Sequence, residues 1–236
     1  MTPARRTVAP ETGCFDRDGF TYIRALFSLE EVDALRAAVT PLFQQSDRAG
    51  VQGLLQHCSA VVEIARTPAL IEALTDLAGT KPFAVRGILF DKNPDANWRV
   101  SWHQDLAIAV RERADIPGFG PWSVKGGVVH AHAPVSVLER MLTVRIHLDD
   151  ADESNGALQV LPDSHRAGKL DGSATERKIE GTKPVTCTAR AGDALVMRPL
   201  VLHASAPAVS PTHRRVIHIE YAVDELPEPL QWFERI

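Results

Sequence analysis

The stretch MLTVRIHL, Met141 to Leu148, alternates in polarity like a β-strand with two different faces. Successive side chains of a strand point to opposite sides, so every second residue shares a face. One face is polar and holds Thr143, Arg145 and His147. The other is apolar and holds Val144, Ile146 and Leu148. The strand therefore predicts a sheet that packs through one face and carries polar groups on the other.

A second stretch, RRVIHIEYAV from Arg214 to Val223, repeats this arrangement. Its polar face holds Arg214, Val216, His218 and Glu220. Its other face holds Arg215, Ile217, Ile219 and Tyr221. Two interpretations are open at this point. The polar faces either form an exposed sheet surface of unusual composition or line a barrel interior with functional groups.

The sequence around these strands predicts a mainly β fold with flanking helices. PFAVRGILF, GALQVLP and DALVMRPLVLH are further short apolar runs, separated by Gly, Pro, Asn and Asp. Helices are expected earlier, within residues 28–78: Ser28 and Glu31 form a capping box, and Gly79 follows a second helix over 68–78. We expect a flexible tail over 1–13 and a single domain over 14–236.

Composition limits the partners of this chain of 236 residues. The net charge of −4 does not favour binding to nucleic acid or to an anionic membrane surface. The start, MTPARRTVAPETG, lacks the apolar segment of a signal peptide, and three separated cysteines suggest a reducing compartment. We expect a cytoplasmic monomer or homodimer that acts on a small molecule.

Two His-x-Asp triplets, His103–Asp105 in SWHQDLAIAV and His147–Asp149, raise the possibility of a metal site. With nine histidines in the chain, one triplet is close to what chance supplies. A non-haem Fe(II) site takes two imidazoles and one carboxylate. Either triplet could supply two of these ligands from one strand end, and His203 is a candidate for the third. Zinc fits less well, because its sites favour His and Cys.

Four motifs in order resemble the phytanoyl-CoA dioxygenase-like family of Fe(II)- and 2-oxoglutarate-dependent oxygenases, over nearly the whole chain. The N-terminal stretch FDRDGFTYIRALFSLEEVDALRAAV and the tetrapeptide WHQD resemble the first two. LDDADESNGALQVLPDSHRAG resembles the third, with matches at Asn155, Gly156, Leu158, Pro162, Ser164 and His165. Asp163 replaces a usual glycine there. Gly192-Asp193, then His203-Ala204-Ser205 and an arginine, resemble the fourth.

The resemblance implies a double-stranded β-helix, a jelly-roll of the cupin type, with iron held by His103, Asp105 and His203. It also implies that 2-oxoglutarate and O2 are co-substrates. The family's 2-oxoglutarate arginine falls on Arg214, eleven positions after His203, and Arg214 also lies on the polar strand face. Further 2-oxoglutarate contacts are expected from two hydroxyl side chains, Ser205 and Thr143. His147 and Asp149 match a structural strand of the family instead.

The resemblance further implies hydroxylation of an unactivated C–H bond in a small metabolite or natural-product intermediate, with release of succinate and CO2. Family members that halogenate lack the carboxylate ligand that Asp105 supplies. Desaturation or ring closure is an alternative outcome. An inactive metal-binding jelly-roll that serves as a binding or regulatory module is another alternative, as is a metal-dependent isomerase or hydrolase.

Substrate contacts are expected from the polar strand faces and from an insertion over residues 106–141. The insertion contains several Gly and Pro residues, and a long loop-rich segment of this kind is typical of a lid. The candidate substrate-binding residues are Arg145, His147, His218, Trp122 and Phe119. The sequence contains no feature that requires a coenzyme A ester.

Overall fold

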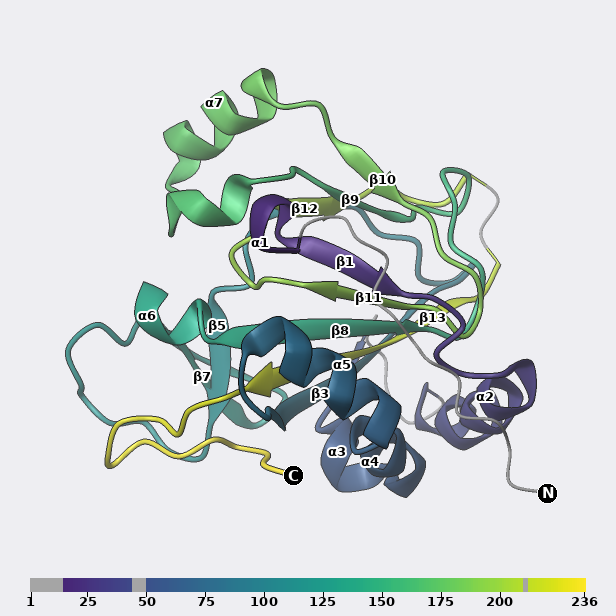
Figure 1. Ribbon diagram of the computed structural model, residues 1–236, viewed down its shortest axis with the longest axis horizontal. Coiled ribbons are helices and arrows are strands. Elements are labelled where there is room, and N and C mark those ends of the chain that lie inside the picture. Colours follow the sequence, from purple (N-terminus) through teal and green to yellow (C-terminus); the bar gives the residue numbers. More distant parts are fainter. Residues whose placement is uncertain (1–14, 44–49, 210–211) are drawn as a thin grey trace.

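The computed structural model describes residues 15–43, 50–209 and 212–236, so the predicted tail over 1–13 lies outside the described residues. A six-stranded antiparallel sheet with the order β1-β11-β8-β13-β3-β2 forms the largest layer (Figure 1). Its strands are β1 (Phe20–Ile23), β2 (Gly50–Gln52), β3 (Phe83–Lys92), β8 (Met141–His147), β11 (Ala194–Met197) and β13 (Arg214–Ala222). The stretches Met141 to Leu148 and Arg214 to Val223 therefore supply neighbouring central strands.

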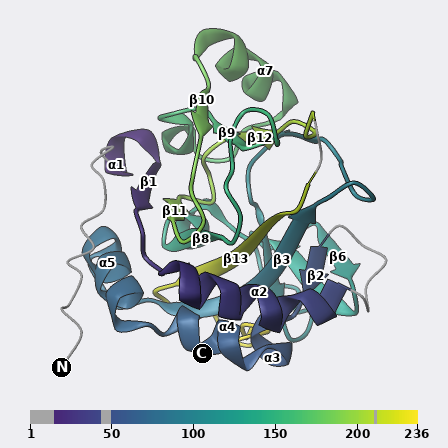
Figure 2. The ribbon, with the colours of Figure 1, turned by 90° about the vertical axis from the view of Figure 1, so that its right-hand side faces the viewer.

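A four-stranded sheet with the order β10-β9-β12-β4 faces the inner side of the larger sheet (Figures 1 and 2). Its strands are β4 (Val100–His103), β9 (Leu158–Val160), β10 (Val185–Cys187) and β12 (His203–Ser205). Apolar side chains of both sheets form one buried cluster that contains Leu158, Val160, Cys187, Leu195, Met197 and Val201. The two sheets make the predicted jelly-roll, so the fold prediction is confirmed.

Helices cover the outer side of the six-stranded sheet (Figure 2). They are α2 (Leu29–Phe43), α3 (Leu54–His57), α4 (Ser59–Ala65) and α5 (Pro68–Ala78). The apolar row of β8 and β13 packs in one cluster with helix residues such as Val32 and Leu70. The capping box is present, because the Glu31 backbone N–H donates to Ser28 Oγ at 3.3 Å and the Ser28 N–H donates to Glu31 Oε2 at 2.7 Å.

The polar rows of β8 and β13 face the interior between the two sheets. The exposed fraction is 0% for Thr143, 8% for Arg145, 1% for His147 and 4% each for Arg214, His218 and Glu220. The interpretation of these rows as an exposed surface is therefore wrong. Arg145, Arg214 and His218 share one pocket with Val100, Leu158 and His203 of the four-stranded sheet. A single-sequence pattern contains no information on which sheet lies opposite.

The insertion over 106–141 contains a separate three-stranded sheet instead of a long loop. Its strands are β5 (Ala107–Val110), β6 (Trp122–Lys125) and β7 (Val128–His132), and α6 (Val135–Leu138) follows. Gly126 and Gly127 join β6 and β7 with φ of 58° and 80°, the positive values that a tight two-residue hairpin requires. These glycines therefore mark a hairpin. Closure of the insertion over a site remains a prediction.

Three short elements complete the described chain: α1 (Phe15–Asp18), the 3-10 helix η1 (Ser164–Ala167) and α7 (Gly172–Gly181). Within the described ranges, the helices include none with the length and apolar content needed to span a bilayer.

Candidate metal centre

Two histidines and one aspartate meet at the end of the four-stranded sheet. His103 ends β4 and His203 begins β12, and these residues are paired in the antiparallel register. Asp105 follows two residues after His103. Its Oδ1 lies 3.7 Å from His103 Nε2, and its Oδ2 lies 3.7 Å from His203 Nε2. The three possible ligand atoms all lie within 4.8 Å of one another, which is the compactness that one metal ion requires.

Both imidazoles are oriented by backbone carbonyls. His103 Nδ1 lies 2.8 Å from the Ser101 carbonyl oxygen, and His203 Nδ1 lies 3.0 Å from that of Val201. Because a carbonyl only accepts, each Nδ1 carries the proton and each Nε2 presents a lone pair. Asp105 Oδ2 is buried and has no hydrogen-bond partner among the described residues. The three residues thus fit a metal cation that would satisfy these lone pairs.

The protonation states also suit metal binding. Burial favours the neutral acid of Asp105, but the neighbouring His203, His218, His103 and Arg145 outweigh burial and lower its pKa to about 2. Burial lowers the pKa of His203 to about 4. At neutral pH the site therefore presents a carboxylate and a neutral imidazole, the forms that coordinate metals.

The alternative triplet is not assembled. Asp149 accepts two hydrogen bonds from the Arg215 guanidinium, at 2.8 and 2.9 Å, and lies 3.2 Å from Arg36 Nη2. The pKa of Asp149 is lowered because the bonds from Arg215 outweigh burial. His147 instead points inward, and its two ring nitrogens have no partner among the described residues. Asp149 therefore belongs to a structural ion pair with Arg215.

A narrow pocket next to the His-Asp-His group is lined by three cationic side chains, Lys92, Arg145 and Arg214. Arg214 is 4% exposed, and its Nε and Nη1 have no hydrogen-bond partner among the described residues. Buried guanidinium N–H groups are unfavourable without an acceptor, and a carboxylate matches their forked geometry. The unpaired atoms of Arg214 therefore fit a carboxylate ligand.

Lys92 is a pocket residue that the sequence did not predict. It ends β3 directly opposite Arg214 on β13. Its Nζ donates to Ser205 Oγ at 2.8 Å and to the Ala206 carbonyl at 2.5 Å. Burial, with the charges of Arg214 and Arg145, lowers the pKa of Lys92 to about 8. Burial and the charge of Arg145 likewise lower the pKa of Arg214 to about 10.

We expect Gly156→Ala to disturb this pocket and the fold together. Gly156 has φ of 75°, and a Cβ there would lie 2.3 Å from the Ala206 carbonyl oxygen, the atom that accepts from Lys92. Left-handed backbone alone costs a non-glycine residue roughly 1–2 kcal/mol, so thermal unfolding should shift to lower temperature. Gly172→Ala is the matched control, because a Cβ at Gly172 meets no atom of the described residues within 4 Å. Equal stability of the two variants would contradict this prediction.

Of the other predicted site residues, Ser205, Arg145 and His218 line the pocket, and Thr143 does not. Thr143 pairs with Glu220, six residues along β13 from Arg214, a separation of roughly 20 Å along the strand. That separation argues against one ligand shared by Thr143 and Arg214.

Phe119 and Trp122 do not line this pocket. They pack against a buried cluster that includes Leu138 and Trp232. Phe119 and Trp122 therefore cover a part of the hydrophobic core next to the three-stranded sheet.

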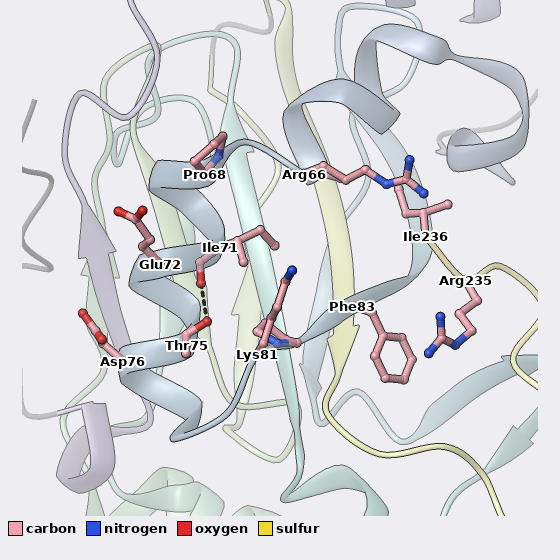
Figure 3. A pocket seen from close by; sticks show the side chains of 12 residues that line it. Arg66, Pro68, Ile71, Glu72, Thr75, Asp76, Lys81, Phe83, Arg235 and Ile236 are labelled. Carbon is pink, nitrogen blue, oxygen red and sulfur yellow. Dashed lines mark hydrogen bonds between the residues drawn. The ribbon is translucent and has the colours of Figure 1, made fainter. Parts of the chain in front are cut away.

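A wider groove of about 850 Å³ lies on the helical side of the molecule, between α5 and the C-terminal segment (Figure 3). Its lining carries both signs of charge, with Glu72 and Asp76 on α5 and Lys81 and Arg235 across from them. Arg235 stacks 4.2 Å above the Phe83 ring. The groove contains no member of the His-Asp-His group, so it is separate from the candidate metal centre.

Solved structures with the same fold include metal- and 2-oxoglutarate-dependent enzymes. The non-heme alpha ketoglutarate dependent carbocyclase SnoK from nogalamycin biosynthesis has a TM-score of 0.69 at 17% identity, covering 88% of this chain and 81% of SnoK. EctD from S. alaskensis, with 2-oxoglutarate and 5-hydroxyectoine, has a TM-score of 0.69 at 18% identity, covering 92% and 81%. The epimerase SnoN, with Fe3+, alpha ketoglutarate and nogalamycin RO, has a TM-score of 0.70 at 18% identity, covering 91% and 88%.

A jelly-roll that presents two histidines and one carboxylate is typical of the non-haem iron oxygenases. The sequence profile of the phytanoyl-CoA dioxygenase (PhyH) family matches residues 15–216, and the chain belongs to this family. Family and fold together indicate an Fe/2-oxoglutarate-dependent oxygenase. A sequence comparison with curated proteins gives no match.

Proposed function

We propose that the protein hydroxylates an unactivated C–H bond of a small metabolite or natural-product intermediate, with iron, 2-oxoglutarate and O2. The observation that carries the proposal is the His-Asp-His group beside a pocket lined by unpaired cationic atoms. His103, Asp105 and His203 would hold the metal ion. Arg214 and Lys92 would hold the far carboxylate of 2-oxoglutarate, and Ser205 would add a hydroxyl.

When bound, iron and 2-oxoglutarate supply the oxidation of the C–H bond, with succinate and CO2 as the other products. The protein's own residues bind, orient and exclude water. Trp98, Val100 and Leu158 line the pocket beside the charged groups and reduce its contact with solvent. The Asp105 N–H donates to the Pro199 carbonyl at 2.9 Å, and this bond fixes the backbone position of Asp105.

Asp105 supports hydroxylation over halogenation, because halogenating members of the family lack this carboxylate. Desaturation and ring closure use the same residues, and the products distinguish them. The test is a metabolite panel scored for substrate-stimulated succinate, followed by mass spectrometry of the product. Hydroxylation adds one oxygen atom, whereas desaturation or ring closure removes two hydrogen atoms. Succinate formation that no compound stimulates, with no altered product, would contradict an active hydroxylase.

Lys92 predicts a pH dependence of co-substrate binding. Its pKa of about 8 in the free protein means that its positive charge is present below that pH and is lost above it. The affinity for the 2-oxoglutarate dianion should therefore fall as the pH rises from about 7 to about 9. Lys92→Met should bind more weakly at pH 7 and show a flatter profile. Parallel profiles for the two proteins, measured by titration of 2-oxoglutarate, would show that Lys92 does not contribute.

A further inference from the structure

Arg145 is a buried cation of the pocket that the proposed contacts do not use. It lies at the middle of β8 and is 8% exposed. Its Nη1 lies 3.1 Å from His218 Nδ1, and its guanidinium carbon lies 5.7 Å from the Phe90 ring centroid. Its Nε is buried without a hydrogen-bond partner among the described residues. The side chain is thus held from two sides and still has donor capacity inside the pocket.

His218 is fixed in turn by a chain of buried polar groups. Because a guanidinium only donates, His218 Nδ1 accepts, and the ring proton is on Nε2. His218 Nε2 lies 3.5 Å from Glu220 Oε1, which also accepts from Arg86 Nη1 at 2.9 Å. His218 also meets Phe90 edge to face at 5.7 Å between ring centroids. Glu220 is paired with Arg86, so its charge is not available to balance Arg145.

The charges around the pocket point to a further anion. Asp105 is the one carboxylate among its lining residues within the described chain, against Lys92, Arg145 and Arg214. A divalent metal ion and a dianionic co-substrate carry equal and opposite charges, so their binding leaves this positive excess unchanged. Like charges close together in a buried pocket repel strongly. Arg145 accordingly contributes to lowering the pKa of both Lys92 and Arg214, after burial as the main cause.

We propose that Arg145, positioned by His218 and Phe90, is a second carboxylate-binding residue of this pocket, separate from Lys92 and Arg214. The proposal rests on the proposed function and assigns a further ligand contact to the same site. The carboxylate belongs either to the keto-acid end of 2-oxoglutarate or to the substrate. In both cases the same chemistry, a planar anion opposite a guanidinium fork, is recognised.

The test uses the Mn(II)-loaded protein and two binding measurements. The first is calorimetric titration of 2-oxoglutarate. The second is the fluorine relaxation of trifluoroacetate near Mn(II), with and without saturating 2-oxoglutarate, against neutral trifluoroethanol. The variants are Arg145→Gln, which removes the charge, and Arg145→Lys, which keeps it. Arg113→Gln is the control, because Arg113 has a 62% exposed side chain and pairs with Asp115 outside the pocket.

We expect Arg145→Gln to lower the affinity for one of the two ligands by at least about tenfold, since a charge-assisted hydrogen bond is lost. Arg145→Lys should lower that affinity less. A loss confined to 2-oxoglutarate binding assigns the carboxylate to the co-substrate, and a loss of trifluoroacetate binding at saturating 2-oxoglutarate assigns it to the substrate. If Arg145→Gln leaves both ligands within about twofold of wild type, with Mn(II) affinity and thermal unfolding unchanged, the proposal is overturned.

Failure of the proposed function has a different signature. In that case wild type would not bind 2-oxoglutarate, or Arg214→Gln would bind it as tightly as wild type. The trifluoroacetate measurement would still detect an anion site, and comparison of Arg145→Gln with Arg214→Gln would show which guanidinium holds the anion. Loss of trifluoroacetate binding in Arg145→Gln under those conditions would support an anion site in a protein with another activity.

Discussion

Asp105→Ala should weaken iron binding by more than about 100-fold and abolish iron-dependent succinate formation while the protein remains folded. Among the described residues, Asp105 supplies the one carboxylate near both Nε2 atoms, at 3.7 Å from His103 Nε2 and from His203 Nε2. Loss of an outer-shell partner of a metal ligand already costs about 10–100-fold in affinity or activity, so loss of the ligand itself should exceed about 100-fold. Equilibrium dialysis with Fe(II) under anaerobic conditions measures the affinity directly.

Asp149→Ala is the matched control, because it removes an aspartate from the competing His-x-Asp triplet. Asp149 binds Arg215 through two side-chain hydrogen bonds and is 15% exposed. Its removal takes away two charge-assisted hydrogen bonds of Arg215 and should lower the free energy of unfolding by about 1.5–3 kcal/mol. Iron affinity should be unchanged. The reverse pattern, with iron lost in Asp149→Ala and retained in Asp105→Ala, would refute the assignment.

Arg214→Gln should raise the KM for 2-oxoglutarate by about 100-fold and leave iron affinity unchanged. The Arg214 guanidinium is buried, and its Nε and Nη1 have no partner among the described residues. Hydrogen bonds to charged groups contribute about 1.5–3 kcal/mol each, and each 1.4 kcal/mol is a factor of ten. Steady-state kinetics of succinate formation at varied 2-oxoglutarate, with the metal affinity measured separately, gives both quantities.

Arg215→Gln provides the control for this variant one position along the chain. Arg215 lies on the opposite face of β13, where it binds Asp149. Its substitution should lower stability and leave the KM for 2-oxoglutarate near the wild-type value. A large KM increase in Arg215→Gln together with a normal KM in Arg214→Gln would reverse the assignment of the two arginines.

Much of the fold could be predicted because its signals are local. The alternation in β8 and β13 and the capping box at Ser28 each lie within a few residues, and the structure confirms them. Helix α7 could not be found this way. It buries no residue, and its apolar side chains are limited to Ala174 and Ile179, so no apolar stripe marks it; its main local signal is the Asp171 side chain that accepts from the Ala174 N–H at 2.8 Å.

The residues of the candidate site could be predicted in part from the sequence, for a different reason. His103, Asp105, His203 and Arg214 stand in motifs of the family, so the resemblance could select them among nine histidines and two adjacent arginines. Lys92 stands in none of the four motifs that resemble the family. Its role depends on the register of β3 against β13, which places it opposite Arg214. Such a register is a tertiary property, and a strand-end lysine alone gives no indication of it.

Anaerobic absorption spectroscopy, with 2-oxoglutarate added to the protein loaded with Fe(II), tests whether His103, Asp105 and His203 bind iron next to a 2-oxoglutarate pocket. We predict a weak visible charge-transfer band in wild type and in Asp149→Ala, and none in Asp105→Ala. No band in wild type at saturating 2-oxoglutarate, together with no succinate in air, would contradict the claim and favour a metal-binding module without turnover.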